Sequence, residues 1–166
     1  WSSNALRPKA VVAYDTMWDS TDLMARVVGE SLHEGGLEVQ LMPLSGSHRS
    51  DLATEVLEAG ALVVGSPTLN NQAFPTVVEA LSYLKGLKPS GRVGGAFGSY
   101  GWSGEAVRLI EDRLRGLKLR VPVEGLRIKL VPDAGELEQC RDLGEQLARH
   151  LTGKVEHREI DMAALA

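Results

Sequence analysis

The chain has 166 residues and a net charge of −4, with 43% hydrophobic and 24% charged residues. This length suits one domain that buries a core without disulfides or metals, and an acidic balance without a basic cluster excludes nucleic acid as a main partner. No apolar run approaches the roughly 20 residues of a membrane span. Cys140 is the single cysteine. Because no signal peptide precedes the first strand-like run, we expect a cytoplasmic protein.

The first half of the chain alternates between patterns typical of strands and of helices. In chain order these are a strand at 9–15, a helix at 20–34, a strand at 37–43, a helix at 50–60 and a strand at 61–67. Ser20 or a neighbour is expected to cap the first helix, and Ser50 or Asp51 to cap the second.

The second half continues the alternation. In chain order it predicts a helix at 74–87, a strand at 92–99, a helix at 103–117, an extended segment at 118–132 and a helix at 133–151. Pro75 suits the first turn of its helix, where a missing N–H costs little, and Ser103 is expected to cap the next helix. We interpret Cys140, within the last helix, as a buried or half-buried structural thiol.

Short apolar runs that alternate with amphipathic helices predict an α/β fold with three layers, in which helices cover both faces of a parallel sheet. Five strands suit the order 2-1-3-4-5. We expect a linker or N-terminal extension at 1–8, one domain at 9–152, and a C-terminal tail without a clear element at 153–166.

Three unusual segments follow the first, third and fourth predicted strands. In open α/β sheets, ligands bind outside the carboxyl ends of the strands, where the strand order reverses. For the order 2-1-3-4-5, this point lies between strands 1 and 3. The segments that can line it are 15–21 (DTMWDST), 66–72 (SPTLNNQ) and 98–104 (GSYGWSG).

The segment 15–21 combines hydroxyl side chains with the start of a helix, which is a favourable place for an anion. It lacks both the GxxxxGK[ST] and the GxGxxG patterns. This composition suits a single terminal phosphate held by neutral donors. The alternative is that Ser20 and Thr21 only cap the helix.

The other two segments offer apolar and aromatic groups. Leu69 lies beside two asparagines that could form only a turn, but an apolar tip flanked by amides could also cover a ring. Tyr100 and Trp102 lie among Gly98, Gly101 and Gly104, which allow the backbone to approach a ligand. The alternative is that Trp102 packs under a helix and Tyr100 lies at the surface. Together, the three segments favour a ligand with a phosphate and a flat ring, and FMN fits that description.

The same three motifs resemble the flavodoxin-like C-terminal domain of flavodiiron proteins, also called A-type flavoproteins. They read AYDTMWDSTDLMA, VVGSPTLNNQAFPTV and AFGSYGWSGEAV, and the similarity covers about 9–151. The resemblance implies a flavodoxin-like fold with bound FMN.

By this resemblance, the FMN phosphate is wrapped by Thr16, Met17, Trp18, Asp19, Ser20 and Thr21. The isoalloxazine ring and ribityl chain are bordered on one side by Ser66, Pro67, Thr68, Leu69 and Asn71, and on the other by Ser99, Tyr100, Gly101, Trp102 and Gly104. Asp19 departs from the flavodoxin pattern, in which glycine is common at this place. If the backbone there has a positive φ, Asp tolerates it better than most residues.

In the flavodiiron family, an N-terminal β-lactamase-like domain reduces O2 or NO at a diiron site with electrons from the FMN, usually across a head-to-tail dimer. The resemblance implies that this chain is an electron-transfer domain that serves such a diiron domain, absent from this chain, or another redox partner protein. A homo-oligomer is compatible with the full-length context. The opening WSSN, without Met, resembles the junction after the diiron domain, so we expect an excised domain.

Two other functions fit the same fold. One is a stand-alone NAD(P)H:quinone oxidoreductase, which direct NAD(P)H oxidation would reveal. The other is a signalling or docking module without flavin. A receiver domain of this kind needs an acidic cluster and a phosphate-accepting Asp at the end of the first strand. Asp15 is there, but no second acidic residue lies near Lys9 and the later Thr and Lys signals are missing, so this function is disfavoured. No metal site is predicted, because the histidines are scattered at His33, His48, His150 and His157.

Overall fold

The computed structural model describes residues 7–16, 19–46, 49–69, 72–87, 92–100, 105–129 and 132–165. The strands are β1 (Arg7–Tyr14), β2 (Glu38–Pro43), β3 (Ala59–Leu69), β4 (Gln72–Ala73), β5 (Val93–Tyr100) and β6 (Leu126–Lys129). The helices are α1 (Ser20–Glu34), α2 (Arg49–Glu58), α3 (Pro75–Lys85), α4 (Glu105–Gly116) and α5 (Ala134–Leu165), with a 3-10 turn at Leu44–Gly46.

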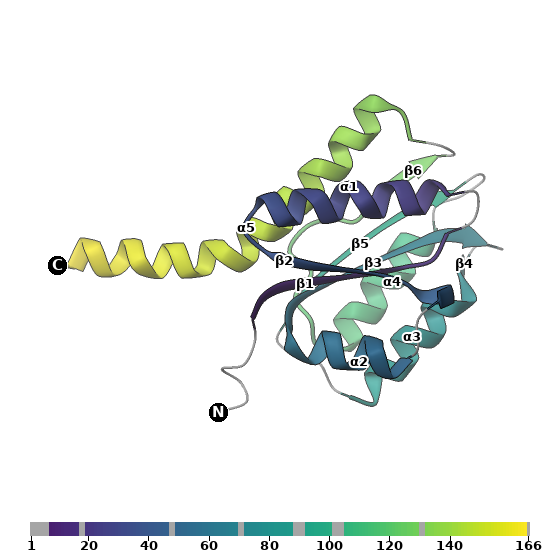
Figure 1. Cartoon of the computed structure of the whole chain (residues 1–166), viewed down its shortest axis with the longest axis horizontal. Coiled ribbons are helices and arrows are strands. Elements are labelled where there is room, and N and C mark those ends of the chain that lie inside the picture. Colours follow the sequence, from purple (N-terminus) through teal and green to yellow (C-terminus); the bar gives the residue numbers. More distant parts are fainter. Residues whose placement is uncertain are drawn as a thin grey trace.

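The sheet has the strand order β2-β1-β3-β5-β6, and neighbouring strands along this path are parallel (Figure 1). This confirms the predicted order 2-1-3-4-5, because β4 lies off the path. The short strand β4 pairs antiparallel with the end of β3, where Leu69 faces Gln72. This hairpin was not predicted, because the segment 66–72 was interpreted as a loop.

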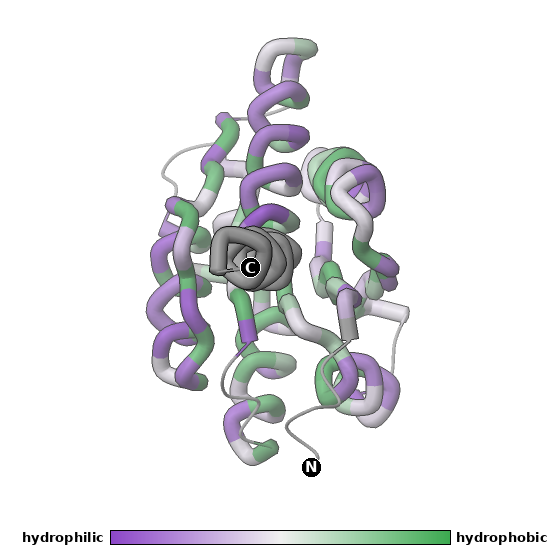
Figure 2. The backbone as a smooth tube through the Cα atoms, turned by 90° about the vertical axis from the view of Figure 1, so that its left-hand side faces the viewer, coloured by the Kyte–Doolittle hydropathy of each residue, from purple (hydrophilic) through white to green (hydrophobic). Residues whose placement is uncertain are grey.

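Helices cover both faces of the sheet. On one face, Met24 and Leu32 of α1 and Leu147 of α5 are buried in one core cluster with strand residues that include Phe97. On the other face, residues of α2, α3 and α4 share a second cluster with β1 and β3. Along the helices, hydrophilic stretches alternate with hydrophobic ones (Figure 2), as helices packed on a sheet require. The three-layer architecture is therefore confirmed.

Several element boundaries differ from the predictions. The backbone of α5 continues to Leu165, so the prediction of a tail without a clear element at 153–166 is wrong. This stretch contains Ala, Glu, Lys, Met and Leu, which all have high helix propensity. The prediction of a tail without a clear element gave this propensity too little weight. Among the described residues 118–129 and 132 of the predicted extended segment, Leu126–Lys129 form the strand β6 and Arg120 forms an isolated bridge with Val93.

The helix starts were predicted to within two residues, and the outcome for the predicted caps differs from helix to helix. Helix α2 begins at Arg49, so Ser50 and Asp51 lie inside its first turn. Helix α1 begins at Ser20, and its N-cap is Asp19, which makes no side-chain cap bond. The predicted cap Ser103 lies outside the described residues. Cys140 is fully buried, as expected for a structural thiol.

Candidate functional site

The carboxyl ends of β1, β3 and β5 meet at one edge of the sheet, as the strand order predicts. Tyr14 at the end of β1 pairs with Gly65 of β3, and Pro67 of β3 pairs with Ser99 of β5. The residues predicted to bind a ligand follow these strands or form their last positions. Thr21, Ser66 and Ser99 are buried, and Thr16, Thr68 and Tyr100 are half-buried.

Not every predicted residue lies where it was expected. Strand β3 continues to Leu69 and β5 to Tyr100, two residues and one residue beyond the predicted strand ends at 67 and 99. Six of the predicted residues lie outside the described residues, namely Met17, Trp18, Asn71, Gly101, Trp102 and Gly104. Whether the described ones contact a ligand stays a prediction.

The start of α1 has the features of an anion site. Asp19 adopts φ 62° and ψ 4°, the left-handed conformation that its position in the motif suggested. Because its side chain makes no cap bond, the first backbone N–H groups of α1 are not satisfied from there. Ser20 and Thr21 follow the N-cap position, so the alternative that they only cap the helix is not supported. Such a helix start suits a phosphate.

A buried hydroxyl pair connects this helix start to β5. The Oγ1 atom of Thr21 and the Oγ atom of Ser99 lie 3.0 Å apart. The relative exposure of these two residues is 0% for Thr21 and 6% for Ser99. One hydroxyl donates to the other. This bond fixes the position of the segment predicted to hold the phosphate relative to the strand end predicted to border the ring.

Two hydroxyls of β3 hold the neighbouring segments in place. Ser66 Oγ accepts a hydrogen bond of 2.8 Å from the N–H of Phe74 and donates one of 2.8 Å to the carbonyl of Pro67. Thr68 Oγ1 accepts from the N–H of Ala106, in the first turn of α4, at 3.3 Å. These two residues therefore organise the β3–β4 hairpin and the start of α4.

The structure gives a reason for glycine at position 98 that the sequence did not reveal. A Cβ atom at this position would lie 2.3 Å from the carbonyl oxygen of Ser66 on the adjacent strand and 3.1 Å from Val107. We expected Gly98 to admit a ligand, but the close approach of β3 alone requires a glycine here.

A polar cluster of Tyr14, Asp22 and Arg26 at the start of α1 was also not predicted. Asp22 Oδ1 accepts a bond of 2.6 Å from the hydroxyl of Tyr14, and Asp22 Oδ2 accepts one of 2.8 Å from Arg26 Nε. The bond from Arg26, followed by that from Tyr14, lowers the pKa of the Asp22 carboxyl. Burial, followed by the bond to Asp22, raises the pKa of Tyr14 to about 12. The spacing of four residues between Asp22 and Arg26 is the sequence signal for this pair.

Asp15 begins the predicted segment 15–21 but was not among the residues expected to hold the phosphate. Its relative exposure is 5%, and its Oδ1 atom accepts a bond of 2.8 Å from the N–H of Thr16. Its Oδ2 atom accepts a bond from the hydroxyl of Thr76 in the first turn of α3. The sequence suggested for Asp15 only the role of a phosphate acceptor in a signalling module. Its contact with Thr76 could not be predicted because it spans 61 residues.

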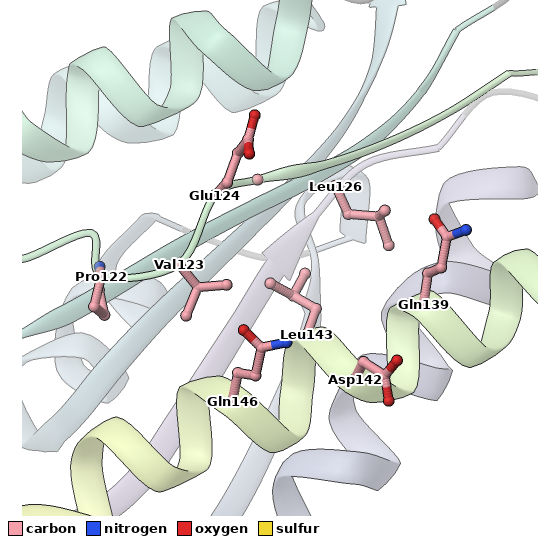
Figure 3. A pocket seen from close by; sticks show the side chains of 9 residues that line it. Pro122, Val123, Glu124, Leu126, Gln139, Asp142, Leu143 and Gln146 are labelled. Carbon is pink, nitrogen blue, oxygen red and sulfur yellow. The ribbon is translucent and has the colours of Figure 1, made fainter.

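A separate groove lies beside the edge strand β6 and contains none of the predicted site residues. It has a volume of about 450 Å³. In Figure 3, Val123 comes from the segment before β6, Leu126 from β6, and Gln139, Asp142, Leu143 and Gln146 from α5. Among the described residues, no three His, Cys, Asp or Glu side chains gather as metal ligands. No helix described is long and apolar enough to cross a membrane.

Comparisons with known proteins agree with this architecture. A family model described as flavodoxin matches residues 12–144. The chain is 42% identical to rubredoxin-oxygen oxidoreductase of Megalodesulfovibrio gigas, over 89% of this chain and 37% of that protein. It is 43% identical to nitric oxide reductase of Moorella thermoacetica, over 91% of this chain and 38% of that protein. The chain therefore spans less than two fifths of the length of these curated relatives.

Solved structures give the same result. The structure of rubredoxin oxygen:oxidoreductase from Desulfovibrio gigas superposes with a TM-score of 0.89 at 40% identity, covering 93% of this chain and 39% of that one. A flavodoxin from the domain Archaea superposes with a TM-score of 0.79 at 31% identity, covering 87% of this chain and 99% of that one. The fold agrees with these matches, and so does the sheet edge at which β1, β3 and β5 end. The chain therefore belongs to the flavodoxin family.

Proposed function

We propose that this chain binds FMN at the carboxyl edge of β1, β3 and β5 and acts as an electron-transfer domain. The observation that carries the proposal is the start of α1, where a left-handed Asp19 makes no side-chain cap bond and Thr16 Oγ1 accepts from the N–H of Asp22 in the first turn. Membership of the flavodoxin family implies a flavin. A flavin with a terminal phosphate fits a helix start better than one without.

The residues present fit both ends of FMN. Hydroxyls and backbone N–H groups of the segment 16–21 would hold the phosphate, with neutral donors supplied by Thr16, Ser20 and Thr21. The segments 66–71 and 99–104 would border the ring and the ribityl chain, with Tyr100 and Trp102 available for stacking. When bound, FMN supplies the capacity to accept and release one or two electrons.

The named relatives suggest where these electrons go. Two of them are called rubredoxin-oxygen oxidoreductase and nitric oxide reductase, and a similar solved structure is called a flavodiiron protein. We propose that this domain relays electrons to a diiron domain that reduces O2 or NO, with the flavodoxin-like domain on its C-terminal side. These names favour an electron relay over a stand-alone NAD(P)H:quinone oxidoreductase, and we propose that the relay acts in the cytoplasm.

A titration of the purified apo protein with FMN and with riboflavin tests the proposal. We expect quenching of FMN fluorescence and tighter binding of FMN than of riboflavin, because riboflavin lacks the phosphate. Thr16→Ala should weaken FMN binding more than riboflavin binding, and Trp102→Ala should weaken FMN binding by about 1–3 kcal/mol if its ring stacks. A protein that does not quench FMN would refute the proposal, and rapid NADH oxidation with a quinone would favour the oxidoreductase.

A further inference from the structure

We infer that Asp15 is a positioning residue for the phosphate end of the FMN site, an inference that rests on the proposed FMN function. Asp15 follows β1 directly, and its backbone N–H donates to the carbonyl of Gly65 on β3 at 3.3 Å. Its side chain is almost fully buried. The residue therefore joins the end of the central strands to the first residue of the phosphate segment.

The two carboxylate oxygens of Asp15 have different partners. Oδ1 accepts from the N–H of Thr16, the first residue of the segment that would hold the phosphate. Oδ2 accepts from the hydroxyl of Thr76 in the first turn of α3. The positive end of the α3 dipole favours a negative side chain at this place. Through these bonds, Asp15 connects β1, the phosphate segment and α3.

These bonds determine which group of Thr16 is available to a ligand. The N–H of Thr16 is taken by Asp15, so it does not have to be satisfied by a phosphate. The hydroxyl oxygen of Thr16 accepts from the N–H of Asp22 at 3.3 Å. A hydroxyl that accepts one bond still has its own proton to donate. Thr16 is therefore oriented to offer its O–H as the donor, and Asp15 holds that orientation.

The inference concerns hydrogen-bond geometry, and substitutions at Asp15 can separate geometry from charge. In Asp15→Asn, the amide oxygen can accept from the N–H of Thr16, while the amide NH2 can donate to the hydroxyl of Thr76. Asp15→Ala removes both bonds. A matched pair at the other end of the contact is Thr76→Val, which removes the hydroxyl, and Thr76→Ser, which keeps it.

The experiment measures dissociation constants of FMN and of riboflavin for the wild-type apo protein and these four variants, together with the thermal unfolding of each. We expect Asp15→Ala to weaken FMN binding by roughly ten- to thirtyfold, the scale of two lost hydrogen bonds, and riboflavin binding by much less. Asp15→Asn and Thr76→Ser should stay within about threefold of the wild type, and Thr76→Val should weaken FMN binding by about fivefold.

Three results would overturn the inference. They are an unchanged FMN affinity in Asp15→Ala, an equal loss for FMN and riboflavin, or a loss in Asp15→Asn as large as in Asp15→Ala. If Asp15→Ala does not fold, the Thr76 pair decides, and equal FMN affinities of Thr76→Val and Thr76→Ser would refute the role. A wild-type protein without FMN affinity would instead refute the proposed function.

Discussion

Single residues at the start of α1 and the end of β5 determine whether the candidate site can form. Asp19 adopts a left-handed conformation that costs most L-residues roughly 1–2 kcal/mol, although Asp and Asn tolerate it better than others. Its side chain is exposed and makes no cap bond. A carboxylate at this position adds a negative charge next to the proposed phosphate, where flavodoxins commonly have glycine.

We therefore expect Asp19→Asn to tighten FMN binding. Asn keeps the tolerance for a positive φ but removes the charge, so the change isolates electrostatic repulsion. The gain should be about two- to fivefold at low salt, the scale of an exposed charge pair, and should shrink as ionic strength rises. Dissociation constants measured by fluorescence quenching at several salt concentrations check this. A gain that is independent of salt would contradict the electrostatic explanation.

At Gly98, the close approach of β3 and β5 leaves no room for a side chain. Gly98→Ala places a Cβ atom 2.3 Å from the carbonyl oxygen of Ser66, and backbone cannot move aside as a flexible side chain can. We expect the free energy of unfolding to fall by about 1–3 kcal/mol or more in urea titrations.

Gly94→Ala is the matched control in the same strand, because the nearest atoms to its Cβ are side-chain atoms at 3.4 Å. It should change the free energy of unfolding by no more than about 1 kcal/mol. Equal effects of the two substitutions would mean that steric contact with Ser66 does not explain the glycine at position 98.

Elements with strong periodicity could be predicted from sequence, and short or context-dependent ones could not. Helix α1 has the predicted bounds of 20–34 because its apolar spacing is regular and Gly35 and Gly36 follow it. The strand β4 has two residues and exists only through its pairing with β3, so no local pattern marks it. After residue 151 the sequence offers helix propensity but no clear apolar pattern, so the end of α5 at Leu165 could not be predicted from periodicity.

The contact between α1 and α5 explains one glycine inside a helix. A Cβ atom at Gly144 would lie 2.7 Å from the carbonyl oxygen of Val28 and 2.8 Å from the Cβ of Ser31. In the same contact, Ser31 Oγ donates to the carbonyl of Arg141 at 2.5 Å. The two helices approach so closely here that a side chain at position 144 would force them apart.

Replacing two glycines of α5 by alanine should have opposite effects. Gly144→Ala should lower the free energy of unfolding by about 1–3 kcal/mol, because the side chain forces α1 and α5 apart. Gly135→Ala lies in the first turn, where the nearest atom is Asp133 Oδ1 at 3.5 Å, so helix propensity should raise stability by roughly 0.5–1 kcal/mol. Urea unfolding of both variants gives the comparison. Stabilisation by Gly144→Ala would show that the helices can separate without cost.

At the scale of the whole molecule, the rule that parallel strands end at one edge was enough to predict that the ends of β1, β3 and β5 meet. It could not reveal which side chains meet there. The Thr21–Ser99 pair spans 78 residues and the Asp15–Thr76 bond spans 61, and neither spacing has a local signature. Sequence reasoning assigned hydroxyls such as Ser66 and Thr68 to a ligand, whereas their described bonds hold neighbouring backbone.

Two buried acidic groups, the thiol of Cys140 and the phenol of Tyr14, predict how the stability of the protein changes at alkaline pH. Burial, with a smaller effect of Glu136, raises the pKa of the Cys140 thiol from 9.0 to about 12, and the pKa of Tyr14 is raised from 10.0 to about 12. Above about pH 9, the unfolded chain loses protons that the folded protein keeps. The free energy of unfolding must therefore fall as pH rises from about 9 towards 12, by up to about 1.4 kcal/mol per pH unit for each group.

Cys140→Ala and Tyr14→Phe each remove one of these groups, so each should flatten the decline, even though each also changes the stability at neutral pH. The measurement is urea unfolding of the wild type, both single variants and the double variant at pH values between 8 and about 11. Lysines titrate in the same range in all four proteins, so the informative quantity is the difference in slope. A double variant that loses stability with pH as steeply as the wild type would show that neither buried group controls the alkaline limit. In that case the decline would have to come from groups that all four proteins share.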